Sequence, residues 1–201
     1  MKWFFKSVSV VFHPLFIPAQ GTLLYFWKSQ HFVSNEIVYA KLTSISILTI
    51  ILPVLIFFML KTLGKVQSVT LRNTNERIIP LGLNCIIIYI VIYSILTASF
   101  SPGLYYFFLG LLMANILCLI LAIFKLKVSL HIMYVTSLFM FTMALSLHFS
   151  TNLNGILILM SIIIGAVASA RLYLKAHSPK EITLGLLTGI VPQLFLIPYW
   201  I

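Results

Sequence analysis

Apolar residues along this chain fall into seven runs, each close to the length of one transmembrane helix. A helix needs about 20 predominantly apolar residues to cross the hydrocarbon of a bilayer. The seven runs are Val8–Trp27, Ala40–Leu60, Ile79–Thr97, Leu104–Phe124, Ser129–His148, Ile156–Leu174 and Ile182–Trp200. Strand-like alternation of apolar and polar positions is missing from them, which argues against a transmembrane β-barrel. The pattern predicts an all-α polytopic membrane bundle of six to seven transmembrane helices.

The first run leaves its path through the membrane open. His13-Pro14 and Pro18 interrupt it, and proline removes a backbone donor and disturbs helix geometry. The segment either bends within the membrane or dips in and returns. The chain begins Met1-Lys2 and soon turns apolar, but it has no convincing small-residue cleavage site. We therefore expect the segment to stay in the mature protein rather than to act as a signal peptide.

Composition supports a membrane protein. Hydrophobic residues make up 61% of the 201 residues and charged residues only 8%, against about 25% charged residues in a soluble domain. Such a chain cannot cover its surface with polar groups, so we expect lipid to be its solvent. Its length suits one integral membrane domain over residues 1–201, with N-terminal helices in 1–60 and, in 61–201, the region that holds the candidates for chemistry described below. Cys85 and Cys118 lie inside apolar runs, which is typical of packing thiols.

The 13 Lys and Arg residues outnumber the 3 acidic residues and gather in one set of connectors. If all seven runs cross, the connectors 61–77, 125–127 and 171–180 share a side with the N-terminus. That side carries eleven basic residues, and the other side carries only Lys28 and Lys41. The positive-inside rule makes the basic side cytoplasmic, and we expect a bacterial inner (cytoplasmic) membrane. The cations lie between apolar runs and not on a polar face, so they do not indicate nucleic-acid binding.

The same three connectors hold the candidates for chemistry. They bring two histidines, a carboxylate, a hydroxyl and several cations to one membrane surface. Arg and Lys bind phosphoryl oxygens and stabilise the charge that moves in a transition state, and a helix N-terminus adds backbone donors. A neutral His can attack phosphorus, a carboxylate can orient that His, and a second His can protonate the leaving alcohol. This chemistry needs no metal or other cofactor, which fits a chain without Asp, because Mg²⁺ sites favour carboxylates.

The connector before the last run resembles a signature of the type 2 phosphatidic acid phosphatase superfamily, an all-helical family that includes lipid phosphatases. The family's third signature is Ser-Arg, five residues, His, three residues, Asp. Here Ala170-Arg171, five residues, His177, three residues and Glu181 match it in spacing. This is the most specific of three matches.

Two further segments resemble the remaining signatures. The second signature, Pro-Ser-Gly-His, is similar to Val128-Ser129-Leu130-His131, which keeps Ser and His and has Leu in place of Gly. The first, Lys, six residues, Arg-Pro, is similar to Lys65, six residues and Arg72-Asn73. Two expected spans separate these segments, where the family usually has a loop or small insertion. The resemblance covers roughly residues 65–190.

The resemblance implies a core like that of these phosphatases and a role for each matching residue. His177 would be the nucleophile, Glu181 its orienting partner and His131 the general acid. The residues expected to bind the phosphate are Arg171, Ser129, Lys65 and Arg72, with Arg77 as an alternative to either Lys65 or Arg72. The implied activity is metal-independent hydrolysis of a lipid phosphate or diphosphate through a phosphohistidine. The family's bacterial membrane enzymes commonly face outward, whereas the charge count places this site inside.

Several residues also have structural interpretations. Ser178-Pro179-Lys180-Glu181 has the pattern of a capping box. From the sequence, this capping role of Glu181 and its catalytic role are equally supported. Arg171 could complement a helix C-terminus or extend to the interface. For the remaining polar residues we favour structural roles: headgroup contact or topology for Lys125 and Lys127, interhelical hydrogen bonds for Asn84 and Asn115, and general structure for His13, His31 and His148.

Two other functions share these features. A lipid phosphotransferase would use the same site with an alcohol acceptor in place of water. A non-catalytic lipid-binding or transport protein would keep the helices without the chemistry. In each case the expected partners are a lipid phosphate and the membrane lipids. Phosphatidic acid, phosphatidylglycerol phosphate, a polyprenyl diphosphate and a lipid A phosphate are all compatible with the sequence.

Overall fold

A computed structural model describes the chain except residues 1, 30–32 and 66–73 and the side chains of residues 2 and 4. The described part is helical, without a β-strand. Seven of its helical segments are long and apolar enough to cross a membrane: Phe5–Lys28, Asn35–Thr62, Asn75–Ser94, Pro102–Ile123, Leu130–His148, Asn154–Tyr173 and Pro179–Tyr199. The prediction of an all-α membrane helical bundle is thus confirmed, with seven candidate spans.

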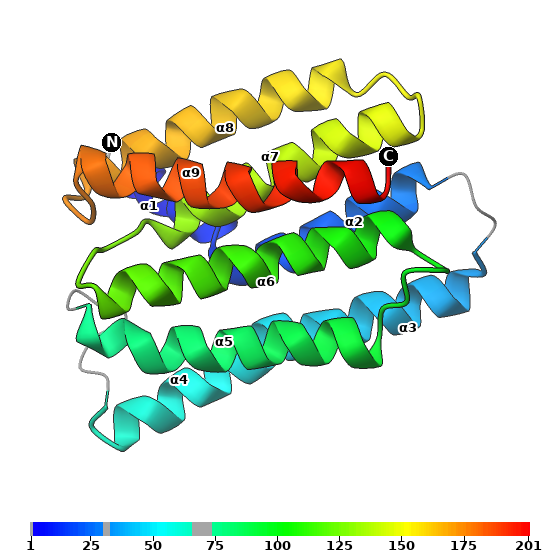
Figure 1. Ribbon diagram of the computed structural model, residues 1–201. Helices are drawn as coiled ribbons and strands as arrows, with labels where there is room; N and C mark the ends of the chain where they lie inside the picture. Colours follow the sequence, from blue (N-terminus) through cyan, green and yellow to red (C-terminus); the bar gives the residue numbers. More distant parts are fainter. Residues whose placement is uncertain (1, 30–32, 66–73) are drawn as a thin grey trace.

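The seven spans are built from the following elements in chain order: α1 (Lys2–Val11), η1 (Pro14–Phe16), α2 (Ile17–Lys28), α3 (Asn35–Ser46), the π-helical turn η2 (Ile47–Ile51), α4 (Leu52–Thr62), α5 (Asn75–Ser94), α6 (Pro102–Ile123), α7 (Leu130–His148), α8 (Asn154–Tyr173), α9 (Pro179–Leu196) and η3 (Ile197–Tyr199). The helices run roughly parallel or antiparallel (Figure 1). The end of α4, the start of α5, and the α6–α7 and α8–α9 connectors lie together at one end of the bundle, close to the N-terminus (Figure 1).

The first span bends and still crosses the bundle. His13 has extended backbone, and its Nδ1 accepts a hydrogen bond from the Leu15 N–H at 3.4 Å, which caps the short helix that Pro14 begins. From there α2 runs to the end of the bundle opposite the basic connectors (Figure 1). Of the two paths that the sequence left open, the structure therefore has the bent crossing.

Helix α7 is the most buried candidate span and packs closely against α9. Gly185 and Gly189 of α9 face it. A Cβ atom on Gly185 would lie 2.8 Å from the Ser129 carbonyl oxygen, and one on Gly189 would lie 2.5 Å from the Met133 carbonyl oxygen. Small residues four apart allow this approach of two backbones within a membrane. The contact holds the start of α7 beside the start of α9.

A polar cluster joins α5, α6 and α7 within the membrane-spanning region. The Asn84 Nδ2 atom donates to Asn115 Oδ1 at 2.9 Å and to the Tyr134 hydroxyl at 2.7 Å. The Asn115 Nδ2 atom donates to the Leu111 carbonyl at 2.7 Å and to the Tyr134 hydroxyl at 2.9 Å. Because an unpaired amide is costly in hydrocarbon, these bonds fix how the three helices pack. The predicted interhelical role of Asn84 and Asn115 is confirmed.

Candidate active site

The turn between α8 and α9 sets the spacing between Arg171 and His177. Helix α8 ends as the backbone of Lys175 turns left-handed, with φ of 51°. The Ala176 N–H then donates to the Arg171 carbonyl at 3.0 Å, and the His177 N–H lies 3.4 Å from the same oxygen. These bonds to the last carbonyls of a helix follow the pattern of a Schellman-type C-cap. The five residues between Arg171 and His177 are therefore a compact helix end.

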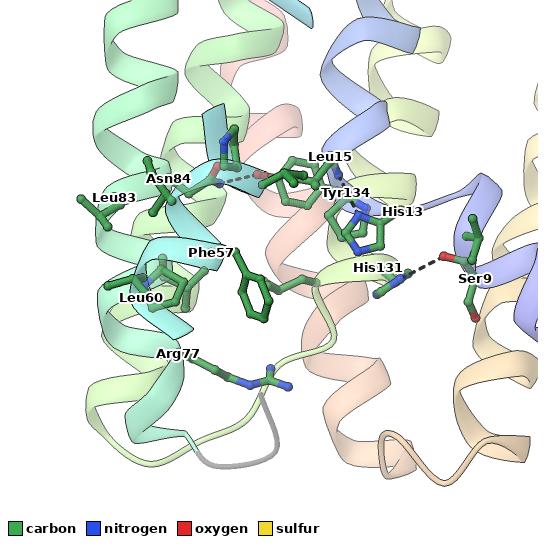
Figure 2. Close-up of a pocket in the computed structure, with 18 of the residues that line it drawn as sticks. Ser9, His13, Leu15, Phe57, Leu60, Arg77, Leu83, Asn84, His131 and Tyr134 are labelled. Carbon is green, nitrogen blue, oxygen red and sulfur yellow. Dashed lines mark hydrogen bonds between the residues drawn. The ribbon is translucent and has the colours of Figure 1, made fainter. Parts of the chain in front are cut away.

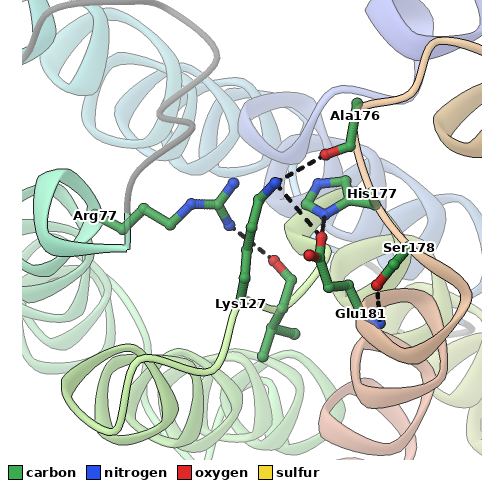
Figure 3. A network of polar contacts seen from close by, with 7 residues as sticks. Arg77, Lys127, Ala176, His177, Ser178 and Glu181 are labelled. Atoms are coloured by element: carbon green, nitrogen blue, oxygen red, sulfur yellow. Dashed lines mark hydrogen bonds and ion pairs between the residues drawn. The ribbon is translucent and has the colours of Figure 1, made fainter.

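Glu181 is part of a helix cap and also binds His177. The Ser178 Oγ atom accepts a hydrogen bond from the Glu181 N–H at 3.4 Å, as the N-cap of α9. The Glu181 side chain points elsewhere: its Oε2 atom lies 2.5 Å from His177 Nδ1 (Figure 3). The two interpretations of Glu181 were a capping residue and a partner of His177. In the structure its backbone N–H takes part in the cap, while its carboxylate binds His177.

Lys127 belongs to the same cluster, which the sequence interpretation missed. Its Nζ atom lies 3.5 Å from Glu181 Oε2 and donates to the Ala176 carbonyl at 2.9 Å (Figure 3). The interpretation of Lys127 as a residue for topology or headgroup contact did not include these contacts within the protein, whereas Lys125 is exposed. The available sequence signal was its position two residues before Ser129, the N-cap of α7.

Two arginines flank this cluster. Arg77 lies in the first turn of α5, inside the helix and not in the preceding connector, and its Nη1 atom donates to the Val128 carbonyl at 2.9 Å. Figure 3 shows its guanidinium beside Lys127. The Arg171 Nε atom is buried and has no hydrogen-bond partner among the described residues. A buried cationic donor in this state favours an anionic partner.

Ser129 and His131 flank the cluster from the start of α7. The Ser129 N–H donates to the Glu181 carbonyl at 3.1 Å. Its Oγ atom is buried without a partner among the described residues. His131 Nε2 lies 3.2 Å from the Ser9 carbonyl of α1 (Figure 2). Because a carbonyl only accepts, that nitrogen carries the proton. The His13 ring packs edge-on against His131, at 5.1 Å between centroids.

A cavity of about 660 Å³ brings part of the predicted site together. His177, His131, Arg171 and Arg77 line it, along with Lys6 and Lys61, two lysines to which the sequence assigned no role in the site. The remaining lining is predominantly apolar. The cavity is therefore basic where it meets the connectors and apolar deeper in the bundle.

Among the other predicted residues, those that the structure describes are not part of the cavity wall. Ser129 and Glu181 reach it only through their contacts with neighbours. Lys65 is exposed and does not line the cavity. Arg72 lies outside the described residues. Arg77 is thus the first-motif candidate that the structure brings to this site.

Electrostatics keep His177 neutral. Burial lowers the pKa of its imidazole, and the positive charges of Lys127, Arg171 and Arg77 lower it further, while the hydrogen bond that His177 donates to Glu181 raises it. With Nδ1 bound to the carboxylate, Nε2 is the nitrogen that remains for chemistry. A neutral imidazole oriented by a carboxylate and surrounded by cations suits nucleophilic attack on an anion.

Comparisons with known proteins add no assignment. No protein-family model, curated protein or solved structure matches the chain. Within the described part of the chain, no group of three or more His, Cys, Asp or Glu side chains is arranged to hold a metal ion. The function therefore has to be inferred from the geometry of the site itself.

Proposed function

We propose that this protein is a membrane-embedded phosphatase that hydrolyses a lipid phosphate or diphosphate, as a divergent member of the type 2 phosphatidic acid phosphatase superfamily. One observation carries the proposal: His177 Nδ1 lies 2.5 Å from Glu181 at a cavity that Arg77 and Arg171 also line. The amphiphilic cavity supports an amphiphilic substrate, because its phosphate would meet the cations while its chain lies among apolar side chains.

In the proposed reaction, the lone pair of His177 Nε2 attacks phosphorus, and the bond from phosphorus to the leaving oxygen breaks. His131, which begins as the imidazolium, gives that oxygen a proton and becomes neutral. The alcohol leaves from a monophosphate, and the lipid monophosphate leaves from a diphosphate. Water then attacks the phosphohistidine, His131 takes a proton from it, and inorganic phosphate is released as His177 returns. Glu181 holds the His177 ring throughout. Arg171 and Arg77 stabilise the negative charge on the phosphoryl oxygens.

The test is phosphate release by the purified protein from a panel of lipid phosphates and diphosphates in EDTA. The proposal expects activity that EDTA leaves intact. The His131→Ala variant should lose about 10²- to 10⁴-fold in rate, because it lacks the general acid. His148→Ala is the matched control, since His148 lies at the opposite end of the same helix, α7. Clear loss of activity in EDTA would count against the metal-independent mechanism.

A second candidate is a protein that binds a lipid phosphate without hydrolysing it. The observation that favours it is the hydrogen bond that His131 Nε2 donates to the Ser9 carbonyl, because the Nε2 proton is then not directed at a leaving group. Tight lipid binding with no phosphate released from any substrate would select this function. A phosphotransferase would instead transfer the phosphoryl group to an added alcohol, which product analysis detects.

A further inference from the structure

The cavity extends from the basic connectors toward the middle of the membrane. Its lining runs along α5 from residue 77 to 87 and along α4 from residue 61 back to 53. At about 1.5 Å per residue, these eight to ten steps give a depth of about 12–15 Å. Half of the roughly 30 Å hydrocarbon thickness is about 15 Å. The cavity therefore has the depth of one lipid leaflet.

Helix α4 forms a thin outer wall for this cavity. The π-helical turn η2 precedes α4, and Pro53 lies in the first turn of α4. Both features change the direction of a helix. Figure 1 shows α4 leaning away from α5 toward the connectors. Leu55 and Met59 of α4 are exposed and do not line the cavity, so α4 separates the cavity from the surrounding lipid by a single helix.

Asn84 places a hydrogen-bond acceptor in the cavity wall. The Asn115 amide nitrogen donates to a backbone carbonyl, so the Asn115 oxygen faces Asn84 and accepts from the Asn84 nitrogen. The orientation of the Asn84 amide is thereby fixed, and its Oδ1 atom remains without a donor among the described residues. Both Asn84 and Tyr134 line the cavity (Figure 2). An acceptor in an apolar cavity favours a ligand that brings a donor.

The position of Asn84 defines where that donor should lie. Asn84 is seven residues deeper along α5 than Arg77, which corresponds to about 10 Å. An extended chain advances about 1.2 Å per bond, so the donor lies about eight bonds from the phosphorus. The whole cavity depth accommodates a chain of about ten to twelve carbons by the same measure.

We infer that this cavity holds the hydrocarbon chain of the substrate and that Asn84 selects a chain bearing a hydroxyl or amide group near its middle. The inference rests on the phosphatase proposed above, since the phosphate must be at His177 for these distances to apply. It narrows the substrate class to acyl-type lipid phosphates with a donor on the chain. A polyprenyl chain has no such group and exceeds one leaflet in length.

The experiment measures dissociation constants of single-chain lipid phosphates for the His177→Ala protein, which cannot turn them over. The chains span about six to sixteen carbons, and each length is tested with and without a hydroxyl at the predicted position. Affinity should rise about fourfold per methylene up to about twelve carbons and then level off. The hydroxylated lipid should bind about fivefold more tightly. Equal affinity across lengths, or for the two lipids of a pair, would overturn the inference.

Variants locate the effect in the cavity. Leu83→Trp fills the cavity and should move the plateau to shorter chains, whereas Ile86→Trp, on the exposed face of the same helix, should leave it unchanged. Asn84→Leu should remove the preference for the hydroxyl. The lipid pairs also test this preference in the His177→Ala protein, in which Asn84 is unchanged, so a poorly folded Asn84 variant does not decide the result. Binding is measured here without hydrolysis. If the native protein released no phosphate, the proposed phosphatase would be rejected, and the dependence of affinity on chain length would still test whether the cavity holds the chain.

Discussion

At the scale of single residues, the site depends on how one imidazole is held. His177 is buried in the turn between α8 and α9, and Glu181 Oε2 binds its Nδ1 while Lys127 contacts the same oxygen. The sequence spacing was sufficient to select His177, Glu181 and Arg171, because a helix cap fixes their separation. Lys127 could not be selected, since its contact depends on how the α6–α7 connector meets the α8–α9 turn.

Replacing Glu181 with Gln should lower the rate of phosphate release by about a hundredfold or more, because the His177 ring loses the carboxylate that orients it. The Glu181 hydrogen bond raises the pKa of His177. Its loss lowers that pKa, so the acid limb of the pH–rate profile should move to lower pH. The measurement is kcat against pH, with Glu36→Gln as the control, since Glu36 is exposed at the start of α3. Unchanged kcat in the Glu181 variant would remove the carboxylate from the mechanism.

Lys127→Met tests the residue that the sequence missed. Its charge lowers the pKa of His177, so the variant should raise that pKa and move the acid limb to higher pH, opposite to the Glu181 variant. The rate should fall by about a hundredfold, because Lys127 helps to hold Glu181 against His177 and a misplaced nucleophile reacts more slowly. Lys125→Met is the control, because Lys125 is exposed two residues away. Identical profiles for the two lysine variants would show that Lys127 is a surface charge only.

At the scale of helices, the site depends on the contact between α7 and α9. Gly185 lets α9 approach the Ser129 carbonyl, and the Ser129 N–H binds the Glu181 carbonyl one turn earlier. Sequence analysis located the spans to within a few residues but gave no pairing of helices. An apolar run shows which residues lie within the membrane, but it does not show which helices pack against each other, because lipid and protein interiors are equally apolar.

Gly185→Ala should lower the free energy of unfolding by about 1–3 kcal/mol, because the added methyl group meets a backbone oxygen that can move only with its helix. The same shift should reduce kcat, since it displaces Ser129 from Glu181. Gly165→Ala in α8 is the control: a Cβ atom there has nothing within 4 Å. Thermal unfolding in detergent, compared for the two variants, measures the difference. Equal stability would show that α7 and α9 pack less closely than described.

At the scale of the whole molecule, an apolar bundle presents its charge and its candidate chemistry at one end. The composition was enough to predict a membrane protein, and the position of the cations predicted three basic connectors on one side. In Figure 1 the α6–α7 and α8–α9 connectors lie at the same end of the bundle, together with the end of α4 and the start of α5. The cavity could not be predicted, because it arises where α4, bent after η2, lies beside α5 and the broken first span.

The charge distribution also predicts an orientation. Eleven of the 13 basic residues lie on the side of the three connectors, so that end should face the cytoplasm. A cysteine replacing Lys180 should react with a membrane-impermeant thiol reagent only after the cells are opened, whereas one replacing Asn152, exposed at the other end, should react in intact cells. The reverse pattern would place the site outside.

The most direct test of the account is the initial rate of phosphate release from lipid phosphates by the native protein and by His177→Ala. The native protein should release phosphate, and the variant should be slower by at least about a thousandfold while remaining folded, because it lacks the nucleophile. A folded His177→Ala protein with the native rate would contradict the phosphohistidine mechanism and with it the central role of this site.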